Sequence, residues 1–101
     1  MIEVQLTDTF TGWLHSLRDA KAAASILNRI DRLAAGNAGD VVPVGKGVSE
    51  LRIHYGPGYR LYFTQRGKAI VILLCGGTKR TQKRDIRLAI EMAKELKDAD
   101  H

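Results

Sequence analysis

Residues able to bind and polarise a phosphate gather in one stretch of this chain, from Glu50 to Arg87. It holds nine of the sixteen lysines and arginines and, apart from Glu50 at its border, a single acid, Asp85. Guanidinium and ammonium groups attract polyanions and stabilise the charge that builds on phosphate oxygens during transfer. The stretch therefore indicates a surface for a polyanion, with a plain solvated surface as the alternative. The nine basic residues are Arg52, Arg60, Arg66, Lys68, Lys79, Arg80, Lys83, Arg84 and Arg87.

Strand alternation places three candidates on one face of a predicted sheet. Arg52, His54 and Arg60 fall on two strands joined at Gly56 to Gly58, so we expect them opposite the apolar residues of the same strands. Like charges this close cost free energy unless a ligand offsets them, which favours a binding site. The alternative is that both guanidiniums form weak surface ion pairs with carboxylates such as Glu50 and Asp85.

A second basic pair follows the most apolar strand, just before the last predicted helix. The positive end of that helix adds to the field of Lys79 and Arg80, which could clamp a phosphodiester together with Arg52 and Arg60. The preceding Gly76-Gly77 either lets the backbone approach a ligand or simply turns the chain. The run GGTKRT lacks the spacing of a nucleotide-binding P-loop, so use of a nucleoside triphosphate is not supported.

The histidines and the cysteine offer few further candidates. His54 is a candidate proton carrier, because an imidazole ordinarily titrates near neutrality and proton transfer is worth roughly 10²–10⁴ in rate. An exposed strand histidine is the alternative interpretation. His15, His54 and His101 have no metal-ligand spacing, and Cys75 is interpreted as a small buried hydrophobe, so no metal or cofactor is expected.

Two strand tyrosines lie beside Arg60 in the sequence. We expect Tyr59 to pack in the core. Tyr62 is interpreted as a residue that stacks on an unpaired base, worth roughly 1–3 kcal/mol, or that offers its hydroxyl.

The elements that must position these residues follow from periodicity, and they predict an α+β fold in the order β-α-α-β-β-β-α. An antiparallel meander is packed by an N-terminal helical hairpin, with a C-terminal helix at the end of the chain. Residues 38–47 are predicted as a connecting loop with a short extended piece at Val41-Val42, and Gly76-Gly77 is predicted to break the last strand. The predicted strands are 2–6, 48–55, 59–66 and 69–75. The first predicted helix begins near Phe10, and the other two cover about 21–35 and 82–97.

Length and composition favour a single domain, residues 1–101, in the cytoplasm. The net charge of +5 arises entirely in the second half of the chain, as expected for a binding face. One cysteine favours a reducing compartment. No secretion signal is recognised, and the longest apolar run, Ala69 to Cys75, is too short to span a bilayer, so no membrane partner is expected.

Two runs, SELRIHYGPGYRLYFTQ and VILLCGGTKRTQKRDI, resemble the RelE/ParE superfamily of toxins from bacterial type II toxin–antitoxin systems. Within it, they are most similar to the HigB-like "addiction module killer" branch. The resemblance covers nearly the whole chain, including TDTFTGWLHSLRD, ILNRIDRLAAGN and the GG-x-K-x-x-Q turn. It is specific for the superfamily, whereas activity must be argued from the site.

The resemblance implies a toxin that a cognate antitoxin neutralises and that otherwise causes growth arrest. Most relatives are ribosome-dependent, metal-independent endoribonucleases that cleave mRNA and so inhibit translation. The family's basic cluster falls here on Arg52, Arg60 and Lys79. In such an enzyme Arg60 and Lys79 stabilise charge while a 2′-hydroxyl attacks the adjacent phosphate. We expect the RNA-binding surface to comprise Tyr62, Arg66, Arg80, Lys83, Arg84 and Arg87.

The sequence departs from the family at the residue that moves protons. Many ribonuclease members carry a tyrosine or histidine on the last helix, which here has neither, so Asp85 and His54 are the titratable candidates. Two alternatives remain: a ParE-like poison of DNA gyrase without nuclease activity, and a non-catalytic RNA- or ribosome-binding module. We expect an acidic or amphipathic segment of the antitoxin to bind the sheet face that carries Arg52 and Arg60. We also expect Arg60→Ala and Lys79→Ala to leave the fold intact, because both are predicted away from the core.

Overall fold

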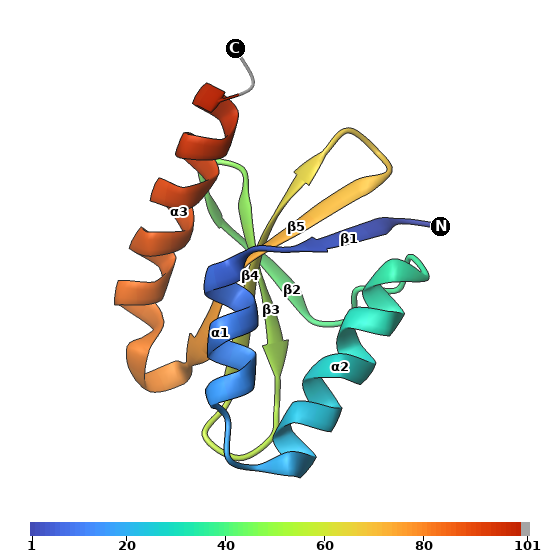
Figure 1. Ribbon diagram of the computed structural model, residues 1–101, viewed down its shortest axis with the longest axis vertical. Coiled ribbons are helices and arrows are strands. Elements are labelled where there is room, and N and C mark those ends of the chain that lie inside the picture. Colours follow the sequence, from blue (N-terminus) through green and yellow to red (C-terminus); the bar gives the residue numbers. More distant parts are fainter. Residues whose placement is uncertain (100–101) are drawn as a thin grey trace.

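The computed structural model describes residues 1–99 and confirms the α+β class, with three helices and a five-stranded mixed sheet within those residues. His101 lies outside the described residues. The predicted helical hairpin and C-terminal helix are confirmed (Figure 1). The elements are β1 (Glu3–Leu6), α1 (Asp8–Ser16), α2 (Ala20–Ala34), β2 (Val41–Gly45), β3 (Val48–Ile53), β4 (Tyr59–Arg66), β5 (Ile70–Thr78), the 3-10 turn η1 (Lys79–Thr81) and α3 (Gln82–Ala99).

The sheet has the strand order β1-β5-β4-β3-β2. Strands β3, β4 and β5 form the predicted antiparallel meander, β2 extends it beyond β3, and β1 adds to the far side of β5 in parallel. One strand was not predicted: β2 lies in the segment that was expected to be mainly loop. Val41 pairs with Leu51 and Val42 with Glu50, so the β-branched residues of this segment do form a ladder.

The predicted break of the last strand at Gly76-Gly77 is wrong, because β5 continues to Thr78 and both glycines pair with β4. The glycines are needed for space. A Cβ atom at Gly76 would collide with the ring of Trp13, and one at Gly77 would collide with the carboxyl group of Asp85. These two glycines therefore let α1 and α3 approach opposite faces of the same strand.

The helical hairpin covers one face of the sheet with an apolar core. Thr7 caps α1 by accepting a hydrogen bond from the backbone of Phe10, and Asp19 caps α2 in the same way. Both helices lie over the same face of the sheet (Figure 1), and their apolar residues pack against those of the strands. The buried residues of this core are Phe10, Leu14, Ala22, Ile26, Leu33, Leu51, Ile53, Tyr59, Leu61, Phe63, Val71 and Leu73.

The opposite face was predicted to be reserved for a polyanion, and the structure corrects this. Helix α3 packs there over a second core. A register shift between β4 and β5 places Leu74 and Cys75, adjacent in sequence, in this same core. Near Gly58 and Lys79, at one end of the sheet, a pocket stays open. The buried residues of the second core are Val48, Tyr62, Ile72, Leu74, Cys75 and Ala89.

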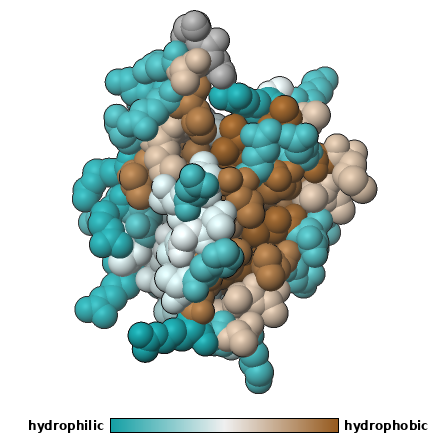
Figure 2. All heavy atoms as spheres, viewed as in Figure 1, coloured by the Kyte–Doolittle hydropathy of each residue, from teal (hydrophilic) through white to brown (hydrophobic). Residues whose placement is uncertain are grey.

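One face of the molecule carries an apolar patch. Figure 2 shows hydrophobic atoms gathered beside α1, over the strands, with hydrophilic atoms along α3. Leu6 in β1 and Leu27 in α2 are 43% and 50% exposed. Across residues 1–99, no helix combines the length and apolar character needed to cross a membrane.

Candidate functional site

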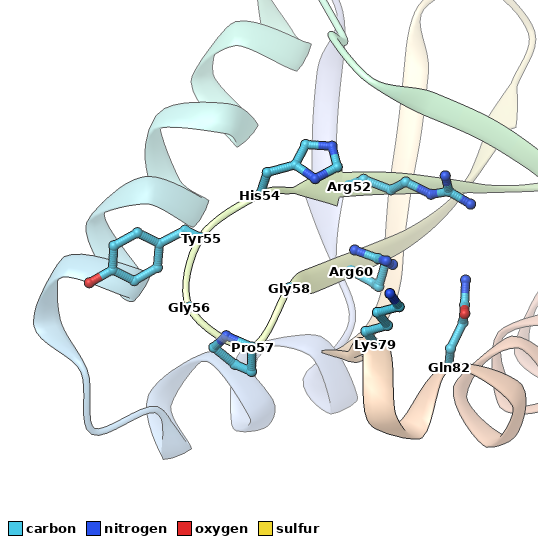
Figure 3. A pocket seen from close by; sticks show the side chains of 9 residues that line it. All are labelled: Arg52, His54, Tyr55, Gly56, Pro57, Gly58, Arg60, Lys79 and Gln82. Carbon is cyan, nitrogen blue, oxygen red and sulfur yellow. The ribbon is translucent and has the colours of Figure 1, made fainter.

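A pocket of about 580 Å³ opens where β3, β4, η1 and α3 meet (Figure 3). It brings together four residues that the sequence singled out: Arg52, His54, Arg60 and Lys79. We call it the basic pocket. Its other lining residues are Tyr55, Gly56, Pro57, Gly58 and Gln82.

Strand register places these side chains. Arg52 and Arg60 lie on adjacent antiparallel strands, as predicted, and the register pairs them directly across β3 and β4; Arg60 is also paired with Gly77 of β5. Gly58 adopts a φ of 79°, a conformation that favours glycine, and its carbonyl accepts a 2.8 Å hydrogen bond from the backbone of Lys79. The β3–β4 turn is therefore tied to η1, and Lys79 is held beside the two arginines.

A buried carboxylate that the sequence analysis treated only as an ion-pair partner organises the site. Glu50 is fully buried and accepts hydrogen bonds from Arg52 at 2.8 Å, Gln82 at 2.8 Å and Tyr62 at 3.0 Å. The Nε atom of Arg60 lies 3.8 Å from the same carboxylate. We call Glu50, Arg52, Arg60, Tyr62 and Gln82 the Glu50 network.

Electrostatics keep this carboxylate ionised. Burial alone would raise the pKa of Glu50, but the hydrogen bonds from Arg52, Gln82 and Tyr62 outweigh it and lower the pKa below its ordinary value. The hydrogen bond between Arg52 and Glu50 also raises the pKa of Arg52. The alternative that the arginines pair with carboxylates is therefore confirmed for Glu50, which offsets one of the positive charges at the pocket.

Arg60 differs from its expected position on an open face. It is only 7% exposed, and its Nε atom has no hydrogen-bond acceptor among the described residues. One of its terminal NH groups donates a long hydrogen bond, 3.5 Å, to the carbonyl of Tyr59. An unmet donor at a buried site costs about 1–3 kcal/mol, so an anion bound in the pocket would supply what this guanidinium lacks. Its burial also removes the premise on which Arg60→Ala was expected to leave the fold intact.

His54 has a carboxylate partner that the sequence analysis did not find. Its Nε2 lies 2.7 Å from Asp40, at the exposed rim of the pocket. This hydrogen bond is the main cause of a lowered pKa at Asp40, to which the charges of Arg52 and Arg29 contribute. Asp40 was missed because it lies in a segment predicted as loop, 14 residues from its partner.

Two proposed site residues lie elsewhere. Asp85 is 4% exposed beside Gly77, accepts a hydrogen bond from the hydroxyl of Thr81 and lies 3.6 Å from Nε of Arg84, so it does not line the basic pocket. Tyr62 is fully buried, and the expectation that it stacks on a base is corrected, because its ring belongs to the second core. Burial and the negative charge of Glu50 raise the pKa of its hydroxyl.

The proposed RNA-binding residues do not form one surface. Arg66 lines a separate pocket of about 650 Å³, with Lys46, Lys94 and Lys97, beside the C-terminal half of α3. Arg66 also donates to the carbonyl of Leu96. The others are exposed on η1 and the first turns of α3, close in sequence to the residues of the basic pocket: Arg80, Lys83, Arg84 and Arg87.

Metal-ligand clusters and the cysteine add no further candidate site in residues 1–99. Within residues 1–99, no cluster of three or more His, Cys, Asp or Glu residues is arranged to hold a metal ion. Cys75 is buried in the second core, and burial, with the charge of Asp85, raises its pKa to about 12. It remains a thiol at neutral pH.

Comparison with known proteins identifies the family. Residues 12–98 match the family described as "Phage derived protein Gp49-like (DUF891)", and the chain belongs to this family. The match includes every residue of the basic pocket. An uncharacterized protein of Haemophilus influenzae is 47% identical over 95 residues, which cover 94% of this chain and 96% of that protein.

Proposed function

We propose that this protein is the toxin of a type II toxin–antitoxin system, in the RelE/ParE superfamily and its HigB-like branch, and that it cleaves mRNA on the ribosome. The Gp49-like family is toxin-like and related to type II toxin–antitoxin modules, which supports the first part. The observation that carries the second part is the basic pocket. There Arg52, Arg60 and Lys79 converge, and Arg60 retains an unmet donor.

The geometry suits transfer of a phosphoryl group within an RNA strand. The scissile phosphate binds between Arg52, Arg60 and Lys79, and the neighbouring 2′-hydroxyl attacks phosphorus. The new O2′–P bond forms as the P–O5′ bond breaks, which leaves a 2′,3′-cyclic phosphate and a 5′-hydroxyl. The three cations stabilise the charge that builds on the phosphate oxygens. His54 is the titratable side chain at the pocket rim that carries a proton.

Positioning is the other contribution of the site. Glu50 holds the Arg52 guanidinium by a 2.8 Å hydrogen bond, and the backbone bond from Lys79 to Gly58 fixes η1. Fixed cations need no rearrangement as charge develops, which is the basis of electrostatic catalysis.

The cognate antitoxin is proposed to neutralise the toxin at the same place. An acidic segment would find three cations there, of which Glu50 offsets one, and its carboxylates would compete with the RNA phosphate.

Growth after induction without the antitoxin tests the proposal. We expect arrest by the unchanged protein and growth with Lys79→Ala, because Lys79 is exposed and its loss removes a phosphate contact without opening the core. Lys68→Ala is the matched control, since Lys68 is also exposed in the basic stretch but does not line the pocket. Absence of arrest by the unchanged protein, or equal arrest by the Lys79→Ala variant, would contradict the proposal.

A further inference from the structure

We infer that Asp40 is a positioning residue that fixes the tautomer of His54, so that Nδ1 of the imidazole accepts the proton of the attacking 2′-hydroxyl. The inference rests on the proposed ribonuclease function and supplies its missing base. The relevant juxtaposition is the 2.7 Å contact between Asp40 and Nε2 of His54, on a histidine that lines the basic pocket.

The contact determines which nitrogen is free. A carboxylate accepts hydrogen bonds, so Nε2 must carry the hydrogen that it donates to Asp40. Nδ1 then has a lone pair and acts as the base. In Figure 3 the imidazole lies on the β3 side of the pocket, across from Lys79 and Gln82 on the η1 and α3 side. A phosphate held by the cations therefore has a base on one side of it.

Asp40 is itself held by backbone contacts. Its carbonyl accepts a 2.9 Å hydrogen bond from the backbone of Arg52, which fixes it beside the strand that carries His54. Arg29 of α2 donates to the carbonyls of Ala38 and Arg52, at 3.0 and 2.9 Å, and so ties the same segment to the end of β3.

Gly39 leaves room for the Arg29 guanidinium that makes these hydrogen bonds. A Cβ atom at Gly39 would lie 2.6 Å from the Arg29 guanidinium, and the φ of 77° there favours glycine. The hydrogen bonds of Arg29 and of the Asp40 carbonyl therefore fix the same segment, which carries the Asp40 carboxylate. The charged groups that act on Asp40 are His54 itself, Arg52 of β3 and Arg29 of α2.

The proton balance of the step is complete. Nδ1 of His54 takes the 2′-hydroxyl proton as the O2′–P bond forms and the P–O5′ bond breaks. The departing 5′-oxygen takes a proton from solvent, and the imidazolium later returns its proton to solvent. The strand is cut without oxidant, reductant or added nucleophile.

Two measurements on Asp40→Asn test the inference, with Asp98→Asn as the control. Asp98 is an exposed carboxylate in the last turns of α3, far along the helix from Gln82. The first measurement is the ¹⁵N shifts of the His54 ring in the free protein at pH 8. We expect the Nε2–H tautomer to dominate in the unchanged protein and in the control, and the bias to be lost in Asp40→Asn, whose amide can donate to Nε2.

The second measurement is single-turnover cleavage of a defined mRNA on programmed ribosomes between pH 6 and 8.5. We expect the rate of the unchanged protein to rise with pH, because a general base must be unprotonated to accept a proton. Asp40→Asn should be slower by about 10-fold or more at pH 8, and the control should be unchanged. Equal rates and pH profiles for Asp40→Asn and the unchanged protein, or a dominant Nδ1–H tautomer in the unchanged protein, would overturn the inference. If the unchanged protein cleaves no mRNA while its Nε2–H tautomer dominates, the failure lies in the proposed function, and the catalytic role falls with it.

Discussion

The two faces of the sheet are built by different rules. Under α1 and α2 lies a core of hydrophobic residues, from Phe10 to Leu73. Under α3 an apolar core continues into a buried polar network centred on Glu50, which is as inaccessible as any residue of the hydrophobic core. The first face therefore contributes to stability, whereas the second contributes to stability and also positions a charged site.

The difference shows how a small domain can position cationic side chains with a buried carboxylate. Glu50 is buried at the edge of the α3 core, so the arginines that it binds are fixed where the helix coverage ends. A buried carboxylate with several charged hydrogen bonds is a strong constraint, since removing it leaves its partners unpaired. The following predictions test whether the two faces differ in this way.

The largest effect is expected at the centre of the polar face. Glu50→Ala leaves Arg52, Tyr62 and Gln82 without their acceptor and Arg60 without the nearby carboxylate, and we expect a loss of about 3–5 kcal/mol in the free energy of unfolding. Urea denaturation followed by circular dichroism measures it, with Glu91→Ala, an exposed carboxylate of α3, as the control. A loss below about 1 kcal/mol would show that the Glu50 network is not part of the folded framework.

Neighbouring glycines sharpen the comparison, because they face the two sides of β5. We expect Gly76→Ala to destabilise through Trp13 and Gly77→Ala through Asp85, by about 1–3 kcal/mol each, as extra atoms enter filled space. Gly12→Ala in α1 is the matched control, for which we expect a change in stability of the opposite sign. Its Cβ meets nothing within 4 Å, and the change should stabilise by roughly 0.5–1 kcal/mol.

Thermal unfolding of the three glycine variants measures these effects. Combining Gly76→Ala with Trp13→Leu should cost less than the sum of the two single changes, because the collision then disappears. Strict additivity would contradict the assigned contact.

Acid should weaken the polar face selectively. The pKa of Glu50 is lowered in the folded protein, so the folded state holds fewer protons than the unfolded state. The stabilisation is therefore complete above the unfolded pKa and is lost as pH falls through the folded one. Below about pH 5 the unchanged protein should lose stability faster than Glu50→Gln, by up to about 1.4 kcal/mol per pH unit. Parallel curves from denaturation at pH 7 to 3 would exclude this role for Glu50.

The smallest effect on stability is expected at the pocket mouth. Lys79 is exposed, with its backbone rather than its side chain bonded to Gly58, so Lys79→Ala should change the free energy of unfolding by less than about 0.5 kcal/mol. The same variant is expected to lose toxicity. A loss of more than about 2 kcal/mol in urea denaturation would place Lys79 in the framework with Glu50.

Sequence reasoning found the three helices and every strand except β2, and it placed Arg52 and Arg60 on one face of two adjacent strands, because strand alternation and turn residues are local signals. It failed where tertiary contacts decide. Gly76-Gly77 looks like a break and is instead the space that Trp13 and Asp85 require. Tyr62 alternates with the surface positions but is covered by α3.

The site was predictable in part for the same reason. Three cations and a histidine share the pocket because they lie next to turns that the sequence marks clearly. Glu50 and Asp40 could not be assigned, since a carboxylate in a strand or loop gives no local sign that a distant side chain will bond to it. Each gains its role only from the fold.

The most direct test of the central claim is a map of RNA 5′ ends within minutes of inducing the protein without antitoxin, beside Lys79→Ala. We predict new ends inside translated reading frames that disappear in the Lys79→Ala variant and persist in Lys68→Ala. Growth arrest without new ends, accompanied by a DNA-damage response, would contradict the claim that the basic pocket cleaves RNA.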